Sequence, residues 1–282
     1  MKYAKWACAA VPVLLAGMLA DRAHGQEAMY TEAATMPAKG NWILRSQVHF
    51  YRYGENPLTG EKREDKYELM NTINVGLARA LSLMVEVPMA LSEKKDASGD
   101  TSWDRGVEDI HVTFKYRVFM ENTGGVDTTR IALLGGAGVT SGDDRDFASQ
   151  SVNPHLGGVY TRVWGRHGFN QDLIYQFNTG GTREANLGGD GPDDALNFNT
   201  AYLYRIYPDR FTSESVGAWY VTAEINGLYE TNGDVELRWA PGLMYEGRTF
   251  GFEVMAQLPL WNELDERPEL DFGVGLGFRF LF

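Results

Sequence analysis

Hydrophobic and polar residues alternate with a period of two along most of the chain. In the segment 81–91 every odd position is Leu, Val or Met, whereas Ser82, Glu86 and Pro88 stand at even positions. The segment 109–118 has apolar residues at even positions and Asp, His, Thr, Lys or Arg at odd ones. Because successive side chains of a strand point to opposite faces, this alternation predicts strands with one apolar and one polar face.

Twelve such runs are present, and most are longer than the strands of soluble proteins, which average about 5–6 residues. A length of about 10 residues is what a tilted strand needs to cross the hydrocarbon core of a bilayer. The runs span 42–53, 67–78, 81–91, 109–120, 130–140, 155–164, 169–178, 196–206, 217–229, 236–246, 249–260 and 269–282. Aromatic residues near the run ends fit the girdles of a membrane barrel: Trp42, Tyr67, Trp164, Trp219, Trp239 and Phe282.

The runs predict an all-β fold, a twelve-stranded antiparallel up-and-down transmembrane β-barrel over residues 42–282. An even strand number is the rule for single-chain bacterial outer-membrane barrels. The run 155–164 is the least regular, since its two faces are hard to distinguish. Pro88, Pro241 and Pro259 cannot donate a hydrogen bond within their runs, and a β-bulge at each would accommodate them.

The connections between the runs support this prediction. If the first strand starts in the periplasm, the external connections are 54–66, 92–106, 141–153, 179–195, 230–235 and 261–269. They are longer on average than the internal ones, as outer-membrane barrels require. They also hold 21 acidic and nine basic residues, so most of the net negative charge lies on one rim.

The first 25 residues have the features of a secretory signal peptide. Lys2 and Lys5 precede a short apolar stretch, and Ala23-His24-Gly25 is a small-x-small cleavage signal. Cleavage would remove Cys8, the single cysteine, so no disulfide or thiolate metal site is expected. Residues 26–41 are then a short periplasmic N-terminal segment, too short for a large folded plug but able to tuck into the lumen.

Average composition alone would suggest a soluble, acidic protein. The formal net charge is -12 and the mean hydropathy is -0.32, which exclude a helical membrane protein and argue against nucleic-acid binding. The low mean hydropathy is also what results when half of every spanning strand faces water. The sequence therefore predicts a protein of the outer membrane of Gram-negative bacteria.

Five segments carry a resemblance to a known family. They are 34–45 (ATMPAKGNWILR), 76–89 (GLARALSLMVEVPM), 108–118 (EDIHVTFKYRV), 239–247 (WAPGLMYEG) and 252–260 (FEVMAQLPL). They resemble the outer-membrane proteins of the meta-pathway of phenol degradation, a family commonly described as transporters. Where members often have Pro-Thr-Gly near the end of the fifth strand, this chain has Val139-Thr140-Ser141-Gly142. The resemblance implies an outer-membrane barrel that passes aromatic or other small apolar compounds, and it supplies no binding residues.

The sequence end GLGFRFLF resembles the last-strand signal that the barrel-assembly machinery reads. The residues that match this assembly signal are Phe278, Phe280 and Phe282. An ordinary apolar strand end is the alternative interpretation.

The predicted inward faces carry charged residues of both signs. Such residues either form a constriction that selects solutes or form structural ion pairs that fill a narrow lumen. Hairpin register is expected to bring Glu86 near Lys115 and Arg117, and Asp172 near Arg205. The candidates are Arg45, His49, Glu86, Asp109, His111, Lys115, Arg117, Asp172, Arg205, Glu224, Arg238 and Glu253.

Catalytic and metal chemistry have little support. Asp109 and His111 share a strand face, but no further ligand lies at metal spacing, and no lipid-facing Ser–His pair indicates a phospholipase. No cofactor, metal or catalytic residue is expected. Acidic external loops suit Ca²⁺ or Mg²⁺ that bridges lipopolysaccharide, or form a solvated rim. Their weak metal candidates are Asp143, Asp144, Asp146, Asp193 and Asp194.

The leading function is a channel or transporter for passive or weakly selective uptake of small molecules. The alternative is a structural or partner-holding envelope barrel with a filled lumen, and an outer-membrane enzyme is the least favoured class. The expected partners are outer-membrane lipid, lipopolysaccharide, the barrel-assembly machinery and a small-molecule solute, whereas nucleic acid is not. The oligomeric state stays open.

Overall fold

In a computed structural model, residues 26–140, 147–180, 191–212 and 214–282 are described. The alternating runs form strands, thirteen within this part of the chain. They are β1 (Trp42–Tyr53), β2 (Arg63–Ala78), β3 (Leu81–Lys95), β4 (Thr101–Val107), β5 (Ile110–Asn122), β6 (Thr128–Val139), β7 (Val152–Trp164), β8 (His167–Gln176), β9 (Ala195–Tyr207), β10 (Gly217–Glu230), β11 (Val235–Gly247), β12 (Phe250–Glu263) and β13 (Leu270–Leu281). Within the described residues, no helix has both the length and the apolar character needed to cross a bilayer.

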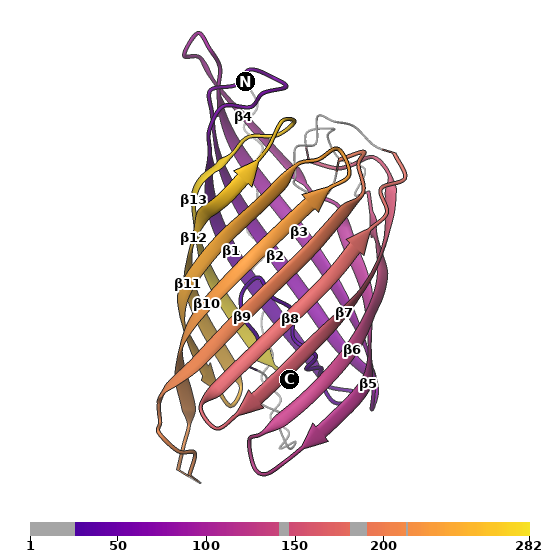
Figure 1. The fold of residues 1–282 in the computed structure, drawn as a ribbon, viewed down its shortest axis with the longest axis vertical. Helices are drawn as coiled ribbons and strands as arrows, with labels where there is room; N and C mark the ends of the chain where they lie inside the picture. The colour runs from indigo at the N-terminus through magenta and orange to yellow at the C-terminus, as the bar shows by residue number, and fades with distance from the viewer. Residues whose placement is uncertain (1–25, 141–146, 181–190, 213) are drawn as a thin grey trace, which may run out of the picture.

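The strands form a closed antiparallel barrel of twelve strands, which confirms the predicted fold class (Figure 1). Each barrel strand pairs with its neighbour in the sequence, except that β3 pairs with β5 as well as with the extra strand β4. Short turns join strands at one end of the barrel, the turn end, as at 79–80 and 248–249. The connections at the opposite end, the loop end, are longer, as predicted for the external side.

The barrel closes where β1 pairs with β13 over nearly their whole length. At the turn end, Trp42 and Phe282 exchange two backbone hydrogen bonds of 3.1 and 2.9 Å. Their rings stack with centroids 4.0 Å apart. The closed ladder leaves no free strand edge in the barrel wall, which is the condition for placing a sheet in lipid.

The outer and inner faces of the wall differ as the alternation predicts. Large apolar side chains point outward and are exposed, including Leu69, Leu133, Leu173, Ile225 and Leu276. Polar and charged side chains point inward and are largely buried, as Glu224, Lys115 and Asp172 illustrate. The apolar outer belt suits lipid, and the polar interior has to satisfy its own hydrogen bonds and charges.

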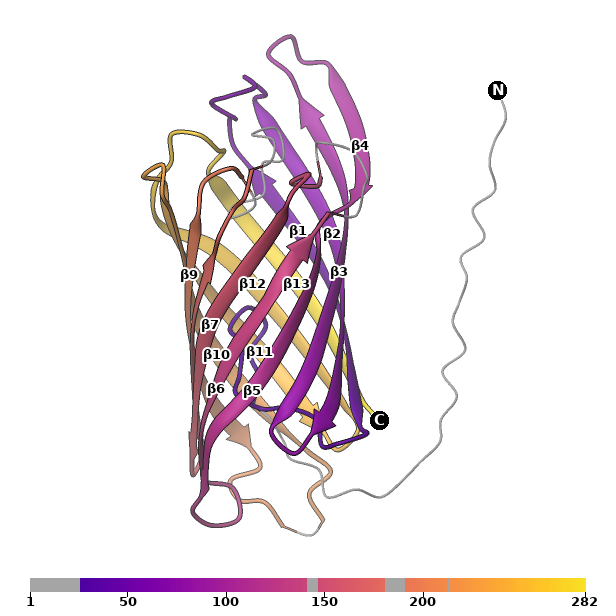
Figure 2. The same ribbon diagram turned by 90° about the vertical axis from the view of Figure 1, so that its right-hand side faces the viewer.

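Strand β4 (Thr101–Val107) was not predicted, because residues 101–106 belonged to the expected external connection 92–106. Strand β3 pairs with β5 from Leu81 to Glu86 and with β4 from Met89 onward. Pro88 lies at this change of partner, where its missing N–H disturbs neither ladder, and its carbonyl accepts a hydrogen bond from the Glu108 N–H at 3.0 Å. The β3–β4 hairpin therefore extends the wall beyond the rest of the rim (Figure 2).

The bulge expected at Pro259 is present. Leu237 pairs with Trp261 and Arg238 pairs with Pro259, so Leu260 is the extra residue. Pairing between β11 and β12 is also interrupted between Trp239 and Gly242, around Pro241. No register shift accompanies this gap in the described β11–β12 ladder, so the bulge expected at Pro241 is absent, and none is present at Pro88.

The predicted leader, residues 1–25, lies outside the described residues. Residues 26–36 form a loop inside the barrel, and residues 37–41 turn at its lower rim to join β1 (Figure 2). The Gly40 N–H donates to the Gly76 carbonyl at 2.8 Å. A Cβ atom at Gly76 would lie 2.1 Å from the Ala38 carbonyl oxygen, so only glycine lets the turn approach β2 this closely.

Replacing Phe282 with Ala tests the proposed assembly signal. Phe278 and Phe280 are exposed on the outer face, and Phe282 stacks on Trp42. We expect assembled barrel in cells to fall several-fold, whereas loss of the stack alone costs only about 1 kcal/mol. Heat-modifiable electrophoretic mobility measures assembly, and refolding of purified protein into detergent measures stability. Phe250→Ala, at the same end, is the control. Equal losses in both assays would contradict a role as assembly signal.

Candidate functional site

Two adjoining cavities occupy the lumen. The upper cavity, toward the loop end, has a volume of about 530 Å³, and the lower cavity has about 450 Å³. The two cavities meet inside the lumen, because their linings share residues of the neighbouring strands β1, β2, β3 and β5 and of β9 in another part of the wall. The shared residues are Tyr51, Glu68, Met70, Glu86, His111, Asn197 and Asn199.

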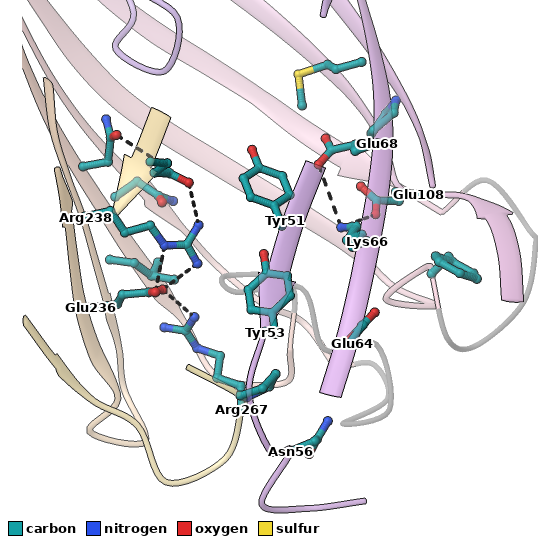
Figure 3. A pocket seen from close by; sticks show the side chains of 18 of the residues that line it. Tyr51, Tyr53, Asn56, Glu64, Lys66, Glu68, Glu108, Glu236, Arg238 and Arg267 are labelled. Carbon is teal, nitrogen blue, oxygen red and sulfur yellow. Dashed lines mark hydrogen bonds and ion pairs between the residues drawn. The ribbon is translucent and has the colours of Figure 1, made fainter. Parts of the chain in front are cut away.

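Two ion clusters face each other across the upper cavity (Figure 3). On one side, Lys66 of β2 lies 2.6 Å from the Glu108 carboxylate. On the other, Glu236 of β11 binds Arg238 at 2.7 Å and Arg267 at 3.1 Å. These cations have their charge compensated by the protein itself, which lowers the cost of burying them.

Aromatic side chains lie between the two clusters and continue downward. Tyr51 and Tyr53 of β1 project into the upper cavity (Figure 3). The Tyr51 hydroxyl is hydrogen-bonded to His49 Nδ1 at 2.6 Å. Tyr30 of the N-terminal segment packs edge-on against His49, with ring centroids 5.4 Å apart. The lumen thus offers apolar ring surface beside charged groups.

The N-terminal segment forms the floor of the lower cavity. The fully buried Glu224 carboxylate of β10 accepts hydrogen bonds from the backbone N–H groups of Met29, Tyr30 and Thr31, and from the Thr31 hydroxyl at 2.6 Å. These bonds replace the bonds to water that the carboxylate loses on burial. Glu224 is therefore the main anchor of the segment.

Other strands hold the segment farther along. Asp172 of β8 accepts a hydrogen bond from the Glu32 N–H at 2.8 Å, and Thr161 of β7 accepts one from the Ala34 N–H at 2.8 Å. The segment is therefore held along one side of the lumen by β10, β8 and β7.

Basic residues of the wall bind the segment as well. Their partners are both its carboxylates and its backbone carbonyls. The contacts are Arg45 with the Ala28 carbonyl at 2.6 Å, Lys115 with Glu32 at 2.6 Å and with the Ala33 carbonyl at 2.8 Å, and Arg279 with Glu27 at 3.4 Å. Burial raises the pKa of the Glu27 carboxyl, but Arg279, Arg45 and Lys115 outweigh this effect and hold that pKa below its ordinary value.

The predicted contacts of Glu86 are wrong. Glu86 is opposite His111 in the register of β3 and β5, whereas Lys115 is opposite Ser82 and binds the N-terminal segment. Arg117 donates to the Arg79 carbonyl at the turn end. The error arises because the β4 hairpin, absent from the prediction, sets where β5 begins.

The predicted pairing of Asp172 with Arg205 is also wrong. Asp172 is opposite Asn199 and accepts a hydrogen bond from its side-chain amide at 2.8 Å. Arg205 lies nearer the turn end, with its guanidinium 4.2 Å from the centroid of the Phe211 ring. Register depends on the connection between β8 and β9, whose length alone does not determine it.

The remaining sequence candidates have the following positions. His49, Glu86, His111, Asp172 and Arg45 line the lower cavity, and Arg238 lines the upper one. Glu253 is buried and binds Arg45 at 2.8 Å. Asp109 is buried and accepts hydrogen bonds from the backbone N–H and the hydroxyl of Ser149. Asp109 thus ties down the connection after β6 instead of pairing with His111.

Several residues of the cavities were not predicted. Lys66 and Arg267 fell in expected connections, and Glu108 lay one residue before an expected strand. Glu32 belongs to a segment with no strand pattern. Strand β2 starts at Arg63, four residues before the predicted run 67–78. Extending that run toward Arg63 was the one sequence signal that could have placed Lys66 in a strand.

The acidic loops do not form a metal site in the described part of the chain. Asp143, Asp144 and Asp146 lie outside the described residues. The Asp194 carboxylate accepts hydrogen bonds from Tyr175 and from the Asn178 N–H, each at 2.8 Å, and the Asp193 carbonyl accepts one from the Asn178 amide. Among the residues described, no group of three or more His, Cys, Asp or Glu side chains could hold an ion.

Comparisons with known proteins bear on the fold. No family model matches the chain, and no curated protein matches it. A crystallised outer membrane channel from Pseudomonas putida F1 matches with a TM-score of 0.56 and 10% identity, over 88% of this chain and 97% of the channel. The NanC porin gives 0.49 and 12%, over 84% and 98%. The beta domain of the Bordetella autotransporter Brka gives 0.48 and 9%, over 87% and 100%.

Identity this low shows the fold alone. The closed twelve-stranded barrel, its apolar outer face and its likeness to an outer membrane channel together place the protein in the outer membrane, surrounded by lipid.

Replacing Glu224 with Ala tests how the segment is held. The change leaves three backbone N–H groups without their acceptor, and a hydrogen bond to a charged group contributes about 1.5–3 kcal/mol. We expect hydrogen-exchange protection of the amides of residues 29–31 to fall about tenfold or more. Glu214→Ala, in an exposed connection, is the control. Unchanged protection would mean that the basic contacts alone fix the segment.

Proposed function

We propose that the protein is an outer-membrane channel for small molecules, with the two lumenal cavities as the path. The observation that carries the proposal is the pair of adjoining cavities inside a closed barrel, lined by polar and charged side chains. Cavities of this size hold molecules of a few hundred daltons, in the range of ligand sites. A polar lining keeps such a path wet and sets the preference among solutes.

Aromatic solutes are the class that we propose. Tyr51 and Tyr53 project into the upper cavity, and Met70 lies where the cavities meet. Tyrosine and methionine favour contact with aromatic rings. The resemblance to the phenol-degradation barrels supports the same class. Because charged groups surround these rings, an aromatic compound that also carries a polar group fits the lining better than a plain hydrocarbon.

The alternative is a non-transport barrel with a filled lumen, and one observation favours it. The N-terminal segment lies across the lower lumen and is held by Glu224, Asp172, Lys115 and Arg279. If the protein is a channel, a solute can pass only when the N-terminal segment moves aside or leaves an open path between itself and the barrel wall. Permeation measurements separate the two functions.

We propose no catalytic role. Thr113 and His155 share a hydrogen bond of 2.8 Å, but both lie in the lumen, away from lipid substrates. We also propose lipopolysaccharide and the barrel-assembly machinery as partners of the outer face and of the last strand.

Deleting residues 27–35 tests the channel. The deletion removes the floor of the lower cavity, so we expect single-channel conductance in KCl to rise several-fold. Glu224→Ala, which keeps the segment but loosens it, is expected to increase the frequency of openings. Glu214→Ala is the control, and heat-modifiable mobility verifies that each variant is folded. If the folded deletion variant passes neither KCl nor small aromatic solutes in liposome swelling, the filled-barrel alternative is correct.

A further inference from the structure

Both cavities carry an excess of negative charge. The upper cavity is lined by seven carboxylate side chains and four Lys or Arg side chains. The lower cavity is lined by five carboxylates and one arginine. A narrow, low-dielectric space concentrates the field of such groups, which raises the local concentration of cations and lowers that of anions.

Two of these carboxylates, Glu68 and Glu86, line both cavities. Glu68 is 8% exposed, yet no hydrogen bond from a described residue reaches its carboxylate. Its ion pair with Lys66 is long, at 3.9 Å, because the Lys66 ammonium group lies 2.6 Å from Glu108. Glu86 likewise makes no hydrogen bond or ion pair with a described side chain, although the charges of Arg45 and Lys115 act on it.

Three other cations of the lumen are already engaged. Each lies within 2.8 Å of a different carboxylate, where Coulomb attraction and a hydrogen bond act together. The pairs are Arg45 with Glu253 at 2.8 Å, Lys115 with Glu32 at 2.6 Å, and Arg238 with Glu236 at 2.7 Å. A carboxylate with few hydrogen-bond donors is costly to place in the lumen, so a cation that enters the lumen lowers this cost at Glu68 and Glu86.

The surroundings of these two residues define that partner. Tyr51 supplies an aromatic face and Met70 an apolar one along the same stretch of wall. Glu68 is opposite Ala90 and Glu86 is opposite Thr72, so their backbone positions are four residues apart along the strands, roughly 13 Å. They are therefore two successive positions along the lumen, one above the other, and not a single chelating pair.

We propose that the lumen selects organic cations, namely small aromatic or apolar molecules that carry an ammonium group. The ammonium group is bound first at Glu68 and then at Glu86, and the apolar body lies against Tyr51 and Met70. An ammonium supplies the hydrogen-bond donors that both carboxylates lack, and it is attracted to the tyrosine face. This inference rests on the proposed function, since it assigns the solute class of the same path.

Three probes of one size separate charge from shape: benzylammonium, benzyl alcohol and benzoate. Reversal potentials in planar bilayers give the permeability of the two ions relative to KCl, and liposome swelling gives that of the alcohol. We expect benzylammonium to pass several-fold better than benzoate. Glu68→Gln and Glu86→Gln should each lower this ratio by about three- to tenfold, since each removes one charge from the path. Glu121→Gln, at an exposed position at the turn end of β5, is the matched control.

Heat-modifiable mobility verifies that each variant is folded. If Glu68→Gln impairs folding because Lys66 loses a neighbouring charge, Glu86→Gln carries the test alone. Conductance with equal permeability of both ions, or with a preference for benzoate, would overturn the inference and leave the channel intact.

If no solute passes, the proposed channel fails instead, and isothermal titration of benzylammonium into the detergent-solubilised protein decides the inference. Binding that weakens in both Glu→Gln variants, but not in Glu121→Gln, supports a cation site in a non-conducting barrel. Absence of binding rejects it.

Discussion

Lipid offers no hydrogen-bond partner, so every backbone N–H and C=O within the hydrocarbon layer has to find one inside the protein. This constraint explains the closed sheet, from the β1–β13 ladder to the Trp42–Phe282 contact at its seam. Closure in turn gives each strand one face toward lipid and one toward the lumen. The charged interior is therefore a consequence of the alternation that makes the barrel possible.

The charged side chains inside the barrel are only partly hydrated, so they need partners of opposite charge or hydrogen-bond donors within the protein. The wall meets this need partly by itself, as in the Lys66–Glu108 pair. It also uses the N-terminal segment, whose backbone N–H groups meet Glu224 and whose Glu32 meets Lys115. Two carboxylates that accept no hydrogen bond from a described residue, Glu68 and Glu86, lie where the two cavities meet. The charged groups of the wall thus determine both how the N-terminal segment binds and which charge the solute path carries.

Alternation predicted the strands well because side-chain direction in a strand depends only on local geometry. It identified the lumen face for the same reason, and residues such as His49 and Asp172 do line the lower cavity. It failed for contacts between strands. The Glu86–Lys115 and Asp172–Arg205 pairings depended on register, and an unforeseen hairpin and a long connection set that register. The position of residues 26–36 inside the barrel could not be predicted from alternation. This segment has irregular backbone that is held by residues distant in the sequence, so its own sequence has no periodic pattern.

The anchor of the segment has one further property. Glu224 holds main-chain N–H groups, which every residue except proline possesses, so the side chains of Met29 and Tyr30 are not needed for that grip. The floor of the lower cavity can consequently change its chemistry without losing its attachment. Substitutions at positions 29 and 30 can therefore change the solute specificity of the lumen without changes in the barrel strands.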